Sequence, residues 1–372
     1  MIFTELQRSL LGTAIWDVNA GAFASWTAVM GVCFSWREVA LSYPELWETV
    51  VSIPNKVYGI PVADDAGTLV ATWPDPTRPM RLLLSPDGAN EALMKAMEPE
   101  VSRICEMRFL VDDEQSRSEI TRLTRTAGHL RTLVITEDDE DAFMMPKVYG
   151  AFAFLEVLCL SGYSLLHQMS AINLRTLKIA NACFCLREEL ESLMYFIEAT
   201  PRLNDAALHD VTFTIPEEDI PTGGHLMRPN LREITCANTS GVVTFFKCFG
   251  IPPSATLVMR DVSGNILPDE ASLLGDFIDK AAADVYIGRG YLKIVISQSG
   301  SVLKAEWTRR FDASLRTFAG LLKHVYALRV HKVEGGVGGR GNNGELGSAE
   351  QIQTHVLQLA GQMRIDCEVV EG

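Results

Sequence analysis

The stretch "LRTLVITEDDEDAFMMPKVYGAFAFLEVLCLSGYSLLHQMSAINLRTLKIA", residues 130–180, contains one pattern three times. Each copy has the form Leu-x-x-Leu-x-Leu, with isoleucine tolerated at the last position, and the copies begin at Leu130, Leu155 and Leu174. Side chains alternate between the two faces of a strand, so the last two apolar positions of each copy share one face. The pattern therefore predicts short strands that each bury one face in a core.

Weaker copies of this pattern extend in both directions along the chain. They are Ile104/Met107/Phe109, Leu203/Ala206/Leu208, Leu231/Ile234/Cys236 and Val325/Leu328/Val330, with a further start near Pro79. From Pro79 to Leu231 successive starts are 25, 26, 25, 19, 29 and 28 residues apart. Most of these spacings fall within the range of about 20–29 residues that leucine-rich repeats have. We expect an α/β fold in which residues 51–372 form an irregular leucine-rich-repeat solenoid with a parallel sheet on its concave face.

Other elements complete this expectation. The segment "REELESLMYFIEATPRL", residues 187–203, has apolar residues at helical spacing and predicts a helix that returns the chain to the next strand. The repeats are least regular over residues 250–372, where two alternating segments around Gly288-Arg289-Gly290 predict a hairpin. A third strand near residues 302–308, a helix near 348–361 and a last strand near 364–370 are also expected. The asparagine that usually follows each repeat strand is mostly absent.

The composition restricts the classes of function. The chain has 372 residues, 47% of them hydrophobic, and a formal net charge of −14, which argues against nucleic acid or an anionic membrane as a general partner. Eight cysteines without a C-x-x-C pair favour free thiols in a reducing compartment. The sequence has neither a secretory signal pattern nor an apolar run of about 20 residues. We expect a cytoplasmic or nuclear protein, without a membrane span and without a homo-oligomer.

The N-terminal region contains a second signature. Trp26, Val29, Cys33, Trp36 and Ala40 lie at helical spacing, and Pro44 predicts that this helix ends by about residue 42. The segment "VCFSWREVALSYPELWETV", residues 32–50, resembles the second half of the F-box in basidiomycete F-box/leucine-rich-repeat proteins. The resemblance implies a helical F-box region at residues 1–50 that docks the adaptor of an SCF-type cullin–RING ubiquitin ligase.

The first half of the F-box pattern is only partly present. Family members open with Leu-Pro and a glutamate, whereas this chain begins "MIFTEL", so the resemblance covers a partial F-box. By resemblance, the adaptor-docking region comprises Ile2, Phe3, Leu6, Val32, Cys33, Trp36, Arg37, Leu46 and Trp47. We expect both tryptophans to be substantially buried. The chain is then either a substrate-recognition adaptor or a repeat scaffold that binds proteins without docking to the ligase.

The repeat pattern also predicts a binding face. Residues on either side of the second apolar position point away from the core, and stacked repeats gather them on the concave sheet, where solenoids bind partners. We expect an unknown protein substrate to bind this ladder, although a solvated strand face is the alternative for any single position. The ladder consists of Thr132, Val134, Val157, Cys159, Thr176, Lys178, Asp205, Ala207, Glu233 and Thr235.

No motif in the sequence supports catalysis. Residues 336–341 match G-x-G-x-x-G, but six residues separate this match from the next expected helix, which favours a loop over a nucleotide site. The acidic run 137–141 lacks the glycine and terminal glutamate of a calcium loop. His324 and His331 are seven residues apart and are not expected to share a metal. We expect no enzymatic activity, no cofactor and no metal site.

Overall fold

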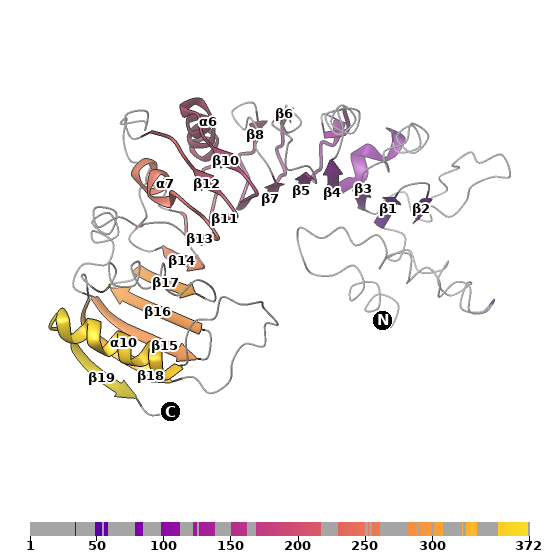
Figure 1. The fold of residues 1–372 in the computed structure, drawn as a ribbon. Coiled ribbons are helices and arrows are strands. Elements are labelled where there is room, and N and C mark those ends of the chain that lie inside the picture. Colours follow the sequence, from indigo (N-terminus) through magenta and orange to yellow (C-terminus); the bar gives the residue numbers. More distant parts are fainter. Residues whose placement is uncertain are drawn as a thin grey trace. The chain divides into compact units, whose positions relative to one another are not determined.

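The chain forms an α/β protein built on a large, mostly parallel β-sheet with few helices, and no closed barrel is found among the described residues (Figure 1). The computed structural model describes residues 34, 49–53, 56–58, 79–84, 98–111, 122–124, 126–137, 150–161, 169–216, 230–249, 252, 255–260, 281–288, 291–298, 301–307, 322, 325–332 and 349–370. Among these residues, no helix is long and apolar enough to cross a membrane.

The chain divides into two compact units. Unit 1 comprises Met1–Leu177 and Tyr195–Arg202, and unit 2 comprises Lys178–Met194 and Leu203–Gly372. The boundary between the units passes through the strand Thr176–Ala180 and through the helix Arg187–Glu198. The expected boundary between residues 50 and 51 falls inside the first strand, Thr49–Ile53.

Unit 1 contains six sheet strands that lie in the order β2-β1-β3-β4-β5-β7. Their bounds are β1 (Thr49–Ile53), β2 (Lys56–Tyr58), β3 (Met80–Leu84), β4 (Ile104–Val111), β5 (Thr132–Glu137) and β7 (Val157–Ser161). The β1–β2 pair is antiparallel, and the pairs from β1 through β7 are parallel. A 3-10 helix, η3 (Glu98–Arg103), precedes β4, and β6 (Gly150–Ala151) forms a small parallel pair with β8 (Met169–Ser170).

A recurring turn leads the chain into successive strands. The backbone N–H of Leu130 donates to the carbonyl of Ala127, and Leu155 and Leu174 donate in the same way to the residues three positions earlier. All three leucines are buried. The first leucine of each pattern therefore closes the turn and anchors it in the core, and the strand begins two residues later.

Unit 2 continues with parallel strands and then adds a hairpin. Here β11 (Asp205–His209), β13 (Glu233–Ala237) and β14 (Thr256–Arg260) are parallel neighbours. The full order is β11-β13-β14-β17-β16-β15-β18-β19, with β15 (Ala281–Gly288), β16 (Tyr291–Gln298), β17 (Ser301–Trp307), β18 (Val325–Lys332) and β19 (Asp366–Val370). Strand β9 (Thr176–Ala180) has its first two residues in unit 1 and the others in unit 2.

Three α-helices are described: α6 (Arg187–Glu198), α7 (Val242–Cys248) and α10 (Ala349–Gln362). At the start of α6, the Glu189 carboxylate accepts hydrogen bonds from the backbone N–H groups of Cys185 and Leu186, which have no partner within the helix. A small parallel pair, β10 (Cys183–Phe184) with β12 (Thr212–Phe213), lies beside α7. Aromatic rings join these elements, because the ring of Phe213 stacks on that of Phe184 with centroids 5.1 Å apart and lies tilted 5.9 Å from that of Phe245.

Most element-level expectations are confirmed. Strands occupy the repeat positions, α6 occupies the expected return helix, and β15 and β16 pair as an antiparallel hairpin. The third strand is β17, the late helix is α10 and the last strand is β19. The sequence reasoning missed α7, β14 and the two small parallel pairs. It also missed Asn181, Asp210 and Asn238, which follow β9, β11 and β13 with left-handed backbone.

A candidate binding face on the sheet

The face of unit 1 opposite the core places Thr132, Val157 and Thr176 where the pattern predicts them. Thr132 pairs in register with Val157, and all three side chains are half-buried. Two other predicted positions differ. Val134 and Cys159, neighbours in the next row, have exposed fractions of 1% and 0%. Both side chains are therefore buried, whereas the pattern placed them on the partner-binding ladder.

The burial of this row has a physical basis in its composition. Val134 and Cys159 are small apolar side chains, which are rarely left in water when neighbours can cover them. The next residue in that row is Arg108, whose long stem is suited to covering apolar neighbours while its charged group stays solvated. Because the opposite face of β5 and β7 packs in the core, both faces of these strands are buried near this row, as is common in parallel sheets.

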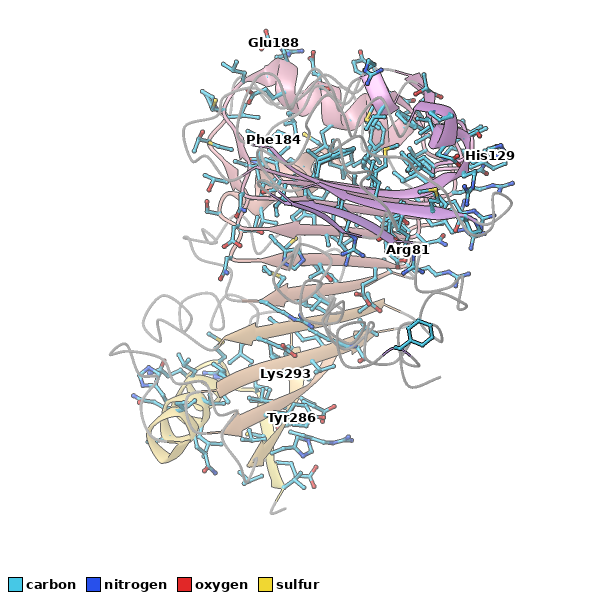
Figure 2. The ribbon with its side chains drawn as sticks, turned by 90° about the vertical axis from the view of Figure 1, so that its right-hand side faces the viewer. Arg81, His129, Phe184, Glu188, Tyr286 and Lys293 are labelled. Carbon is cyan, nitrogen blue, oxygen red and sulfur yellow. The ribbon has the colours of Figure 1, made fainter. Side chains whose placement is uncertain are left out.

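The unit 1 face also carries charged residues that the sequence reasoning missed. The Glu106 carboxylate lies between two arginines, 2.6 Å from Nε of Arg108 and 3.6 Å from Nε of Arg81. Arg81 and Glu106 are register partners in the row that contains Thr132, whereas Arg108 lies in the row of Val134. Figure 2 shows Arg81 beside the sheet strands (Figure 2). The alternation of charged and apolar residues along β3 and β4 could have predicted that Arg81 and Glu106 lie on this face.

In unit 2 the predicted ladder residues lie on neighbouring strands. Asp205 pairs in register with Glu233, and Ala207 pairs with Thr235. Asp205 and Glu233 are exposed, and the hydroxyl of Thr235 donates to the Glu233 carboxylate at 3.3 Å. Burial raises the pKa of Asp205 above its usual value; the Glu233 carboxylate adds to this rise, while Arg232 and Lys178 oppose it. Two carboxylates therefore share one end of the face with a lysine close by.

A second row crosses the other end of the same strands and was not predicted as part of the face. The register joins His209, Ala237, Arg260, Glu306, Lys293, Tyr286 and His331 in that order. Lys293 and Tyr286 lie on adjacent strands in Figure 2. Burial lowers the pKa of His209, and the nearby charge of Lys178 lowers it further. The alternation of polar and apolar residues along β14 to β18 could have assigned these residues to one face, but it does not reveal which strands are neighbours.

The hairpin end of this row combines ion pairs with a ring contact. Glu306 bridges Lys293 at 2.8 Å and Arg260 at 3.5 Å. Tyr286 and His331 stack with ring centroids 4.7 Å apart, and the His331 Nε2 lies 3.2 Å from the Asp284 carboxylate. The unit 2 face is therefore polar, with both signs of charge, and it offers hydrogen bonds, ion pairs and one aromatic surface to a partner.

The thiols of Cys236 and Cys248 are buried. Burial raises the pKa of Cys236 to about 12 and that of Cys248 to about 11, which disfavours the thiolate that a nucleophile requires. Within the described ranges, no group of three or more His, Cys, Asp or Glu side chains is arranged to hold a metal ion.

The expected adaptor-docking residues lie outside the described part of the chain. This holds for Ile2, Phe3, Leu6, Val32, Cys33, Trp36, Arg37, Leu46 and Trp47, and therefore for the expected burial of both tryptophans. In the expected helix 26–42 only Phe34 is described; it is helical and 74% exposed.

Comparison with known proteins gives no relative. No protein-family model matches the chain, and neither a curated protein nor a solved structure matches it significantly.

Proposed function

We propose that this chain is a leucine-rich-repeat protein that binds a protein substrate through the polar face of its sheet and docks an SCF-type ubiquitin-ligase adaptor through residues 1–50. In this proposal the chain has no catalytic activity of its own and acts in the cytoplasm or nucleus. The repeats form an irregular solenoid, and the adaptor region is the partial F-box that residues 32–50 resemble.

The observation that carries the proposal is a repeated local geometry. The turn that ends in a buried residue recurs before β5, β7, β9 and β14, with N···O distances of 3.2, 3.3, 3.0 and 2.9 Å. A left-handed Asn or Asp follows β9, β11 and β13, and its N–H donates to the end of the next strand. When the same type of turn recurs before several strands, and another type recurs after several strands, the arrangement is typical of stacked repeats.

The chemistry of the face supports protein binding. Lys178, Asp205 and Glu233 present charges of both signs within one unit, flanked by the small residues Ala207 and Thr235. Such a mixed surface suits specific recognition of a protein, because complementary charges fix the orientation of a partner and disfavour wrong ones. The same surface also serves the alternative function, a repeat scaffold that binds proteins without docking to a ligase.

Adaptor docking is tested by pull-down of the purified adaptor with the full chain and with a variant lacking residues 1–50, after circular dichroism has shown that the variant is folded. Capture by the full chain alone supports docking. Capture by neither supports the scaffold alternative. Equal capture by both places adaptor binding outside residues 1–50 and contradicts the proposed role of the F-box-like region.

Substrate binding is tested by a block substitution on the face: Thr176→Ala, Lys178→Glu, Glu233→Lys and Thr235→Ala. A matched control changes Gln358 and Gln362, exposed residues of α10, to alanine. A protein captured by the wild type and the control should be lost by the face variant and should be ubiquitinated in a reconstituted ligase. If the face variant retains every captured protein, the face is not the binding surface.

A further inference from the structure

The turns that precede the strands of unit 1 expose a row of large side chains. Phe154 and Ile172 have exposed fractions of 48% and 53%, and His129 is exposed in the preceding turn. The His129 and Phe154 rings lie 5.3 Å apart at a tilt of 30°. Figure 2 shows His129 beyond one end of the strands (Figure 2). These side chains therefore lie at the amino ends of β5, β7 and β9, in the turns that precede the strands.

The successive turns are joined into one continuous surface. The N–H of Glu156 donates to the carbonyl of Arg131 at 2.8 Å, and the N–H of Arg175 donates to the carbonyl of Glu156 at 2.8 Å. The Asn173 side-chain amide donates to the carbonyl of Ala153, and Arg202 donates to the Asn173 amide oxygen at 2.7 Å. The residues exposed on these turns thus keep fixed positions relative to one another.

Three arginines belong to these turns or donate a hydrogen bond to them. Arg131, Arg175 and Arg202 are exposed, and Glu156, whose backbone joins the turns of Arg131 and Arg175, is half-buried. Among the described residues, none of the three arginines forms an ion pair. This arrangement contrasts with the net charge of −14 of the whole chain. We call the set His129, Arg131, Phe154, Ile172, Arg175 and Arg202 the arginine ridge.

We propose that the arginine ridge is a second interaction surface, which binds an acidic peptide segment carrying a bulky apolar side chain. Arginine binds carboxylates through paired N–H groups, and three exposed guanidinium groups without an ion pair to any described residue provide that chemistry here. The exposed Phe154 and Ile172 supply the apolar area that anchors a peptide side chain. Neither property belongs to the mixed-charge face, so this surface is independent of the proposed function.

An acidic peptide suits the ridge better than nucleic acid does. A long polyanion would meet the remaining surface of a chain with net charge −14 and would be repelled outside the ridge. A short peptide contacts the ridge alone. Its side chains also match both halves of the surface, because carboxylates pair with arginines while one apolar residue packs on the ring of Phe154 or on Ile172.

The test is selection of random peptides displayed on phage against the immobilised full chain, followed by fluorescence anisotropy with the enriched peptides. The ridge variant is Arg131→Gln, Arg175→Gln and Arg202→Gln, and a second variant is Phe154→Ala. The matched control is Arg329→Gln, an exposed arginine of β18 in unit 2. Labelled single-stranded RNA is titrated in parallel.

The expected result is enrichment of peptides with several Asp or Glu residues around one aromatic or aliphatic residue. The ridge variant should weaken their binding by about tenfold or more and Phe154→Ala by several-fold, with the control unchanged and binding weaker at high salt. The proposal is overturned if no acidic peptides are enriched, if the ridge variant binds them normally, or if the ridge binds RNA more tightly than the peptides. Self-association that the ridge variant abolishes, without peptide binding, also overturns it.

Discussion

Nζ of Lys293 lies 2.8 Å from Oε1 of Glu306, and the two residues face each other directly on antiparallel strands. The second oxygen of Glu306 lies 3.5 Å from Nε of Arg260 on the strand that pairs with the other side of β17. One carboxylate therefore joins three strands, because it lies between two cations that would otherwise repel each other. The contact links the hairpin to the parallel part of unit 2.

Glu306→Gln should lower the free energy of unfolding by about 1 kcal/mol, since both ion pairs involve a half-buried carboxylate. The loss should be smaller in 1 M salt, because salt screens the charged groups of these ion pairs where they are exposed to solvent. Urea denaturation measures the change. The control is Glu368→Gln, whose carboxylate lies 3.7 Å from Arg329 with both side chains largely exposed. An equal effect at both positions would show that burial does not strengthen the Glu306 contacts.

Gly241, which precedes α7, has a φ of 64°. A Cβ at this position would lie 2.2 Å from the backbone oxygen of Phe213. Gly241→Ala therefore combines left-handed strain with a clash against backbone, and we expect it to cost about 3 kcal/mol or more. Thermal unfolding of the variant measures this loss.

Gly361→Ala is the matched control within the same unit. Apart from its chain neighbours and the backbone of its own helix, no atom lies within 4 Å of its added Cβ, and the residue belongs to α10, where alanine is favoured over glycine by up to about 1 kcal/mol. The control should be neutral or slightly stabilising. Similar melting temperatures for both variants would contradict the close approach of Gly241 to Phe213.

Asn238 follows β13 with a φ of 49°, and its N–H donates to the carbonyl of Arg260 at 2.9 Å. Asparagine and glycine adopt this left-handed conformation more readily than other residues. We expect Asn238→Ala to cost about 1 kcal/mol in urea denaturation, and Asn238→Gly to cost less. The reverse order would mean that the side chain rather than the backbone conformation matters at this position.

Local patterns predicted much of this fold. The alternation of Leu133 and Ile135 with Thr132 determines which face of β5 enters the core, and the glycine at residue 288 agrees with the end of β15, the first strand of the hairpin. Both depend on neighbours along the chain. In contrast, α7 was missed because its sequence "VVTFFKC" is a short apolar run that periodicity does not distinguish from a strand.

The candidate site was less predictable because it depends on contacts between distant segments. Strand β14 pairs with β17 rather than with the next strand along the chain, so Arg260 meets Glu306 across the skipped hairpin. No pattern within one strand contains this information. For the same reason, the burial of Val134 and Cys159 could not be deduced from their alternation, which assigns a face but not what covers it.

His209 gives the unit 2 face a dependence on pH. Its pKa is lowered from 6.5, first by burial and then by the positive charge of Lys178, with Arg260 adding to this effect and Asp210 opposing it. The unfolded chain therefore binds a proton at this residue more readily than the folded chain does. The contribution of neutral His209 to the free energy of unfolding is therefore fully present above pH 6.5, and it is lost as the pH falls toward the lowered pKa.

His209→Gln should remove this pH-dependent loss, because glutamine does not titrate. Relative to the wild type, the variant should therefore gain stability as the pH is lowered from 8 through about 6.5 to 5, with a constant difference at higher pH. Urea denaturation of both proteins at each pH measures the difference, and His355→Gln, at an exposed histidine of α10, provides the control. Parallel curves across this range would mean that folding does not lower the pKa of His209. If the variant instead becomes relatively less stable at low pH, protonation of His209 stabilises the folded protein. Either result contradicts the arrangement of Lys178 and Arg260 around His209.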